Sequence, residues 1–148
     1  MKRSWLVMLM VILPVAASAR LAVAVEDKEE GLSGTWLPVS AELGKQKLPD
    51  ATLKIMKLVL TDKTYAVHVA DDVDKGTVKL DASKTPKAMD ITGTEGPNKG
   101  RTMLAIFELK GDTLRVCYDL KGKARPREFT AMADQAPLFL VTYKRVKP

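Results

Sequence analysis

The most distinctive polar residues of the sequence are two arginines, Arg125 and Arg127, that flank Pro126. Proline fixes the local backbone, and each guanidinium presents a planar fork of donors that matches a carboxylate, a phosphate or an acidic sugar. This pattern suits recognition of an anionic group on an envelope protein or a glycan. Arg125 and Arg127 are therefore candidate ligand-binding residues.

The same segment also has a structural interpretation, which we favour. One of the two arginines would pair with Asp90 or Asp119 and close one end of the domain, because paired charges are common where loops seal a core. Phe129 would then fill the core. In this interpretation Asp90 and Phe129 are structural residues.

Residues that commonly perform catalysis are sparse, since His68 is the only histidine and Cys117 the only cysteine. No residues lie at metal-ligand spacing around His68, and a nucleophile pair of Cys117 with His68 would join two different hairpins. Asp71, Asp72 and Asp74, followed by Lys75-Gly76, do not fit the ligand spacing of a calcium loop, so we expect a solvated turn. We predict a protein that is not an enzyme and has no metal or cofactor.

Residues 103–120 must position much of the domain, because they read as two strands joined by a turn at Gly111-Asp112. This turn places apolar residues opposite one another on one face: Leu109 with Leu114, Phe107 with Val116, Ala105 with Tyr118, and Met103 with Leu120. On the other face it places Glu108 opposite Arg115, and a half-buried Cys117 opposite Ile106. A slip of one residue would break both patterns, so the register is well specified.

A second hairpin is predicted around Asp62-Lys63, and further short strands follow at nearly regular spacing. Asp50 could cap a short helix, with a strand starting near Leu53 as the alternative, and Pro38 indicates an edge or a bend in the first strand. Residues 125–129 are interpreted as a short bent strand. The pattern predicts an all-β fold, namely an antiparallel up-and-down β-barrel of about eight strands with at most one short helix.

Alternation along these strands predicts which side chains point into the barrel. A barrel of eight strands can be filled by side chains or can hold one small ligand. If a ligand is present, Tyr65 or Tyr118 would be its polar handle. The predicted inward residues are Trp36, Met56, Leu58, Leu60, Tyr65, Val67, Val78, Leu80, Met89, Ile91, Phe107, Val116 and Tyr118.

Residues 1–24 have the basic start, apolar run and small-residue cleavage motifs of a secretory signal peptide, with cleavage after Ala19 or Ala24. An uncleaved N-terminal anchor is the alternative. Residues 25–31 would be a charged linker and residues 32–148 the barrel domain. We therefore expect an exported protein, periplasmic or secreted, that keeps no stable membrane span after cleavage.

The charge of the mature chain is modest. The full chain has 24 basic and 18 acidic residues and a net charge of +6, and cleavage after Ala24 removes three basic residues, which leaves 21 basic residues and a net charge of +3. The lysines are scattered and not clustered, so a nucleic-acid partner is not expected. We expect a monomer.

Several segments together resemble an uncharacterised family of exported domains found mainly in planctomycete bacteria. They cover nearly all of the mature chain in order: Gly34-Thr35-Trp36, Gly76 to Asp81, Lys84 to Asp90, Glu95 to Gly100, Gly111 to Leu114, Cys117-Tyr118, and Arg125 to Phe129. The resemblance implies a lipocalin-like fold.

The chain also resembles the lipocalins proper at two positions. Lipocalins carry a Gly-x-Trp motif near the first strand and an arginine near the last strand that packs over the tryptophan. Gly34-Thr35-Trp36 and Arg145 match these features. The resemblance implies structural roles for Trp36 and Arg145, which would close one end of the barrel through a cation–π contact.

The leading hypothesis is a non-catalytic exported binding module that holds a small apolar ligand in its barrel. The alternative is a protein- or glycan-interaction domain with a filled core that binds through its rim, at Arg125 and Arg127. An internal cavity would favour the first hypothesis, and a solid core with a basic rim would favour the second.

Overall fold

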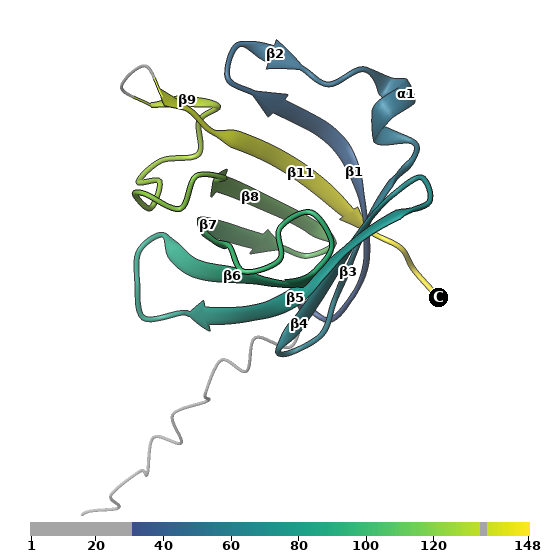
Figure 1. The fold of residues 1–148 in the computed structure, drawn as a ribbon, viewed down its shortest axis with the longest axis horizontal. Coiled ribbons are helices and arrows are strands. Elements are labelled where there is room, and N and C mark those ends of the chain that lie inside the picture. The colour runs from purple at the N-terminus through teal and green to yellow at the C-terminus, as the bar shows by residue number, and fades with distance from the viewer. Residues whose placement is uncertain (1–30, 134–135) are drawn as a thin grey trace, which may run out of the picture.

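Eight antiparallel strands close into a barrel within residues 31–133 and 136–148, the part of the chain that the computed structural model describes (Figure 1). The predicted signal peptide and the linker up to residue 30 lie outside the described residues. The barrel strands are β1 (Gly34–Leu43), β3 (Met56–Leu60), β4 (Thr64–Val69), β5 (Asp72–Asp81), β6 (Lys87–Glu95), β7 (Thr102–Lys110), β8 (Thr113–Asp119) and β11 (Phe139–Arg145).

Each barrel strand pairs with the next barrel strand along the chain, and β11 closes the barrel by pairing with β1. This is the predicted up-and-down arrangement. The register between β1 and β11 shifts between Pro38 and Ser40, so the predicted bend at Pro38 is present as an irregularity in the strand. Because the barrel is closed, every barrel strand pairs with a neighbour on both of its sides.

Both predicted hairpins have the predicted register. Across β7 and β8, Leu109, Phe107 and Ala105 lie opposite Leu114, Val116 and Tyr118, and Gly111 adopts the left-handed conformation (φ 58°) that the turn requires. The predicted pair of Met103 with Leu120 lies beyond the end of β8. Across β3 and β4, the pairs are Met56 with Val69, Leu58 with Val67 and Leu60 with Tyr65.

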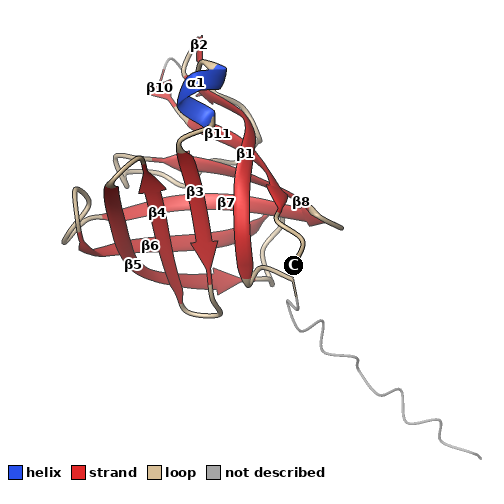
Figure 2. Cartoon of the chain, turned by 90° about the vertical axis from the view of Figure 1, so that its right-hand side faces the viewer, coloured by secondary structure: helices blue, strands red, loops and turns tan. Residues whose placement is uncertain are grey.

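Four short elements lie outside the barrel wall. They are β2 (Gln46–Lys47), α1 (Asp50–Leu53), β9 (Met132–Ala133) and β10 (Ala136–Pro137). Figure 2 shows α1 and β2 beyond the end of the barrel where β3 begins. The short helix is present as predicted, but its N-cap is Pro49, and Asp50 lies in its first turn without capping it.

The segment from 120 to 138 differs most from the sequence predictions. Residues 125–129 form no strand, and Phe129 does not fill the barrel core. Phe129 instead packs outside the barrel, on a second small cluster built on Ile106, Cys117 and Leu138. This segment covers the outer face of the β7–β8 hairpin, so Cys117 is fully buried and not half-buried as predicted.

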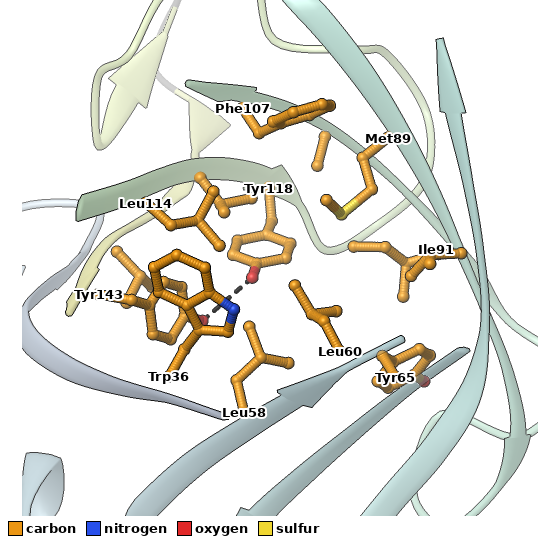
Figure 3. Close-up of a cluster of buried hydrophobic side chains, with 14 of the residues drawn as sticks. Trp36, Leu58, Leu60, Tyr65, Met89, Ile91, Phe107, Leu114, Tyr118 and Tyr143 are labelled. Carbon is orange, nitrogen blue, oxygen red and sulfur yellow. Dashed lines mark hydrogen bonds between the residues drawn. The ribbon is translucent and has the colours of Figure 1, made fainter. Parts of the chain in front are cut away.

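The main core lies in the barrel interior (Figure 3). Trp36, Phe107, Leu114, Val116 and Val141 have at most 1% of their surface exposed. All thirteen residues predicted to point inward belong to this core cluster or pack against it, except Met56, which lines the cavity described below. The alternation of side chains along each strand therefore placed the interior correctly.

Candidate functional site

The barrel interior contains a cavity of about 240 Å³. Its lining is mostly apolar and comes from seven strands and two loops. The lining residues are Met56, Leu58, Leu60, Tyr65, Val67, Val69, Asp74, Val78, Met89, Ile91, Pro97, Asn98, Met103, Val116, Tyr118, Leu120, Phe139 and Tyr143. The barrel is therefore not filled completely by side chains.

One end of the barrel is closed by Trp36 and Arg145. The Arg145 guanidinium lies over the Trp36 ring, with its carbon 4.2 Å from the ring centroid. The indole N–H donates to the Leu32 carbonyl at 2.9 Å, and Arg145 donates to the carbonyls of Ser33, at 2.8 Å, and Gly31. The contact that the lipocalin resemblance implied is present, and it holds the preceding chain segment across this end.

The cavity reaches solvent at the opposite end. The lining residues that keep partial or full exposure include Met56, Val69, Pro97, Asn98 and Phe139, which lie where β3 and β11 begin and β4 ends, or in the loop after β6. The lining residues nearest the closed end, such as Leu60, are buried. A ligand would therefore enter between the β6–β7 loop and the start of β11.

Two tyrosine hydroxyls meet inside the barrel. The hydroxyls of Tyr118, on β8, and Tyr143, on β11, are hydrogen-bonded to each other at 3.0 Å (Figure 3). Burial raises the pKa of Tyr143 to about 12, and burial together with the neighbouring Tyr143 raises the pKa of Tyr118 well above its usual value. Both phenols are therefore neutral at physiological pH and act as hydrogen-bonding groups.

Raising the pH above 10 should destabilise the protein. The unfolded state releases a phenolic proton near pH 10, whereas folded Tyr143 holds its proton to about pH 12, so the unfolded state binds fewer protons in this window. We expect the free energy of unfolding to fall by about 1.4 kcal/mol per pH unit for each such tyrosine. Urea unfolding at pH 9 and pH 11 measures this slope. An equally steep slope in Tyr118→Phe/Tyr143→Phe would contradict the assignment.

A second polar group lies near the open end and is formed by Tyr65, Asp74 and Asn98. The Asp74 carboxylate accepts the Tyr65 hydroxyl at 3.0 Å, the Asn98 side-chain amide at 2.8 Å and the Asn98 backbone N–H at 3.0 Å. Asp74 is 9% exposed, so the prediction that it lies in a solvated turn was wrong. Burial, followed by the Asp74 contact, raises the pKa of Tyr65.

Asp74 has a structural consequence for the open end, because it joins β5 to the loop between β6 and β7. That loop supplies Pro97 and Asn98 to the cavity lining. Gly96 adopts a left-handed conformation (φ 91°) and packs against β5, where a side chain would collide with the strand. The loop is thus fixed over one side of the cavity opening.

Arg125 lies outside the cavity and is held by the barrel wall. Its guanidinium pairs with Asp90 at 2.5 Å and donates to the carbonyls of Ala105 at 2.9 Å and Met89 at 3.3 Å. The structural interpretation named Asp90 or Asp119 as the partner, and Asp90 is the one used. Arg127, in contrast, is exposed, so of the two candidate arginines only Arg125 is held by the barrel wall, although both line the hollow described below.

Arg125→Met should lower the free energy of unfolding by about 1–3 kcal/mol, because it removes charge-assisted hydrogen bonds that are partly shielded from water. The same substitution at exposed Arg127 should change it by less than about 0.5 kcal/mol. Denaturant unfolding of the two variants gives the comparison. Equal effects at both positions would contradict the structural role of Arg125.

Asp119 stabilises the turn that begins the covering segment. Its buried carboxylate accepts backbone N–H groups of Lys121, Lys123 and Ala124 at 2.8–3.0 Å. Burial alone would raise its pKa, but these three hydrogen bonds outweigh burial and lower the pKa of Asp119. Its partners are therefore backbone groups and not an arginine.

A second hollow, of about 850 Å³, lies outside the barrel along residues 119–133 and 136–138. Its lining includes exposed Lys121, Lys123 and Arg127, together with Glu128. This hollow is larger and more polar than the cavity inside the barrel. It corresponds to the rim that the interaction-domain alternative requires.

Groups with potential for catalysis lie apart from each other in the described part of the chain. Burial raises the pKa of the Cys117 thiol, which donates to the Thr130 carbonyl at 3.3 Å, so the thiol is a poor nucleophile. His68 lies on the outer face of β4 opposite Lys57. Residues 31–133 and 136–148 contain no cluster of three histidine, cysteine or acidic residues that could hold a metal ion.

Sequence reasoning identified Tyr65 and Tyr118 but missed Tyr143, Asp74 and Asn98. The alternation Val141, Tyr143, Arg145 in the last strand could have shown that Tyr143 points inward with Val141.

Of the helices that the structure describes, none has the length and apolarity to cross a membrane. Comparison with protein-family models, curated proteins and solved structures finds no match for this chain.

Proposed function

We propose that the protein is an exported, non-catalytic binding module that holds a small apolar molecule in its barrel. The observation that carries this proposal is the cavity, which is apolar along its walls, closed at the Trp36–Arg145 end and open at the other. Concave apolar sites with a few converging polar groups are typical of small-molecule binding. This cavity argues against the solid core that the interaction-domain alternative requires.

The size of the cavity limits the ligand. At about 240 Å³ it exceeds the engineered apolar cavity of roughly 150 Å³ that binds benzene, and it is smaller than typical drug-sized pockets of about 300–1,000 Å³. A ligand of one or two rings, or a short branched chain, would fit. A long acyl chain would extend out of the opening.

Titration with tetralin, a two-ring hydrocarbon, tests this proposal. The protein is purified after expression of the full chain in an exporting host, and the methyl groups are followed by NMR. Methyl signals of cavity residues such as Leu58, Val78 and Val116 should shift, whereas those of exposed Val39 and Ile55 should not. Shifts at exposed methyl groups alone would contradict binding in the barrel.

Export is part of the proposal and rests on residues 1–24 together with the resemblance to exported lipocalin-like domains. Cleavage after Ala19 gives a mature chain that begins at Arg20, and cleavage after Ala24 gives one that begins at Val25. The intact mass of the purified protein distinguishes these two forms from the uncleaved chain. Recovery of the uncleaved chain alone would favour an N-terminal anchor.

A second candidate function is recognition of an acidic glycan or protein in the outer hollow. The observation that favours it is the set of exposed basic side chains there, with Arg127 beside the fixed Arg125. Pull-downs from an envelope extract with wild type and Arg127→Ala test it. Loss of a partner in the variant would favour this function, and an unchanged set of partners would count against it.

A further inference from the structure

We propose that the cavity selects an uncharged ligand with a carbonyl oxygen, to which the Tyr118–Tyr143 hydroxyl pair donates a hydrogen bond. This inference rests on the proposed function and names the chemical class of the ligand. It follows from the hydrogen bonds inside the cavity and from the charge of its lining.

The hydroxyl pair has one proton more than it uses. Two phenols carry two O–H protons, and the single hydrogen bond between Tyr118 and Tyr143 uses one of them. Neither hydroxyl has another hydrogen bond to the described residues, and neither residue is more than 8% exposed. The remaining O–H therefore has its best acceptor in a molecule that occupies the cavity, because an unused donor in an apolar interior is costly.

The charge of the lining argues against an anionic ligand. Among the described lining residues, Asp74 is the only acidic one, and none is a lysine, arginine or histidine. A buried carboxylate would lack a cationic partner and would be repelled by Asp74. A fatty-acid carboxylate inside the barrel is thus disfavoured.

The cavity also offers few acceptor positions to a cationic ligand. The Asp74 carboxylate already accepts three hydrogen bonds, from Tyr65 and Asn98, and a carboxylate offers about four acceptor positions. Little capacity is left for an ammonium group. A neutral molecule whose carbonyl oxygen reaches the tyrosine pair matches the available donor without leaving a charge unpaired.

Four probes that share the tetralin skeleton test this inference by titration into the protein. They are tetralin itself, 1-tetralone, protonated 1-aminotetralin and tetralin-1-carboxylate. We expect 1-tetralone to bind about 5–10-fold more tightly than tetralin, the gain of one buried hydrogen bond. Both charged probes should bind at least about tenfold more weakly than tetralin, because each brings an uncompensated charge into the cavity.

Variants locate the effect. Tyr118→Phe/Tyr143→Phe removes both hydroxyls and should bind 1-tetralone no more tightly than tetralin, because the ketone oxygen then has no donor. Tyr65→Phe is the matched control and should keep the preference for 1-tetralone, because the Tyr65 hydroxyl is used by Asp74. If the double variant does not fold, the infrared carbonyl stretch of 1-tetralone bound to wild type gives the answer, since a hydrogen bond lowers its frequency.

The outcomes separate this inference from the proposed function. Equal binding of tetralin and 1-tetralone by wild type, or an unshifted carbonyl stretch, would overturn the inference and leave the apolar binding module in place. Tightest binding of 1-aminotetralin would overturn it in favour of a cation site at Asp74. Absence of binding by all four probes would overturn both.

Discussion

Trp36→Ala is expected to lower the free energy of unfolding by about 3–5 kcal/mol, the range for removing a fully buried aromatic side chain. Trp36 has none of its surface exposed and packs at the centre of the closed end. The substitution removes the indole hydrogen bond to Leu32 and the ring beneath the Arg145 guanidinium. It would also leave a void that the surrounding strands, closed by β1–β11 pairing, cannot readily fill.

Two variants control for this effect. Trp36→Phe keeps an aromatic ring but loses the N–H donor, so its cost should be intermediate. Leu37→Ala shortens the next residue of β1, which is 44% exposed on the other face, and should cost less than about 1 kcal/mol. Urea unfolding measures all three. A cost for Trp36→Ala no larger than that for Leu37→Ala would show that the Trp36–Arg145 contact does not hold the barrel end.

Val67→Trp should weaken tetralin binding by about 100-fold or more, a loss of roughly 2.8 kcal/mol. Val67 lies on β4, lines the cavity and pairs with Leu58 on one side and Asp74 on the other. An indole at this position would occupy the space that the ligand needs. Since it enters an existing cavity, the substitution should change the free energy of unfolding less than an insertion into a packed core.

The matched control is His68→Trp, which adds the same side chain to the next residue of the same strand, on the outer face. It should leave tetralin affinity unchanged within about twofold, because it does not reach the cavity. Calorimetric titration of the two variants gives the comparison. Equal loss of binding in both variants would indicate a general disturbance of β4, and unchanged binding by Val67→Trp would place the ligand elsewhere.

The barrel could be predicted because each hairpin carries its own register signal. Gly111 adopts the left-handed conformation at the turn of the β7–β8 hairpin, and the alternation around this turn shows which residues point inward. On the outer face of the same hairpin, Glu108 and Arg115 lie opposite each other and form an ion pair at 3.4 Å. This pair agrees with the same register. These signals act within a single hairpin, where the periodicity of apolar residues is informative.

The features that could not be predicted depend on contacts between distant segments. Cys117 and Phe129 meet outside the barrel because an irregular segment folds back over β8, and such a segment has no periodicity to show where it packs. Asp74 is buried because Asn98, 24 residues later, returns to it. An aspartate followed by Lys75 and Gly76 has only the local signature of a turn.

The polar residues of the cavity were predicted only in part, because some lie in hairpins with a local register signal and others depend on distant segments. Tyr65 and Tyr118 lie in hairpins with clear register, so their inward orientation follows from alternation. Their hydrogen-bond partners come from other strands or loops. The partner of Tyr118, Tyr143, lies on β11, whose place beside β8 and β1 results from closure of the whole barrel.

Native mass spectrometry tests the central claim most directly. Wild type and Val67→Trp are expressed as full chains in an exporting host, purified without detergent and compared before and after solvent extraction. We expect wild type to carry a discrete added mass, consistent with a small neutral molecule, that disappears on extraction and is absent from Val67→Trp. The bare polypeptide mass for both proteins, or the same added mass on both, would contradict a ligand held in the barrel.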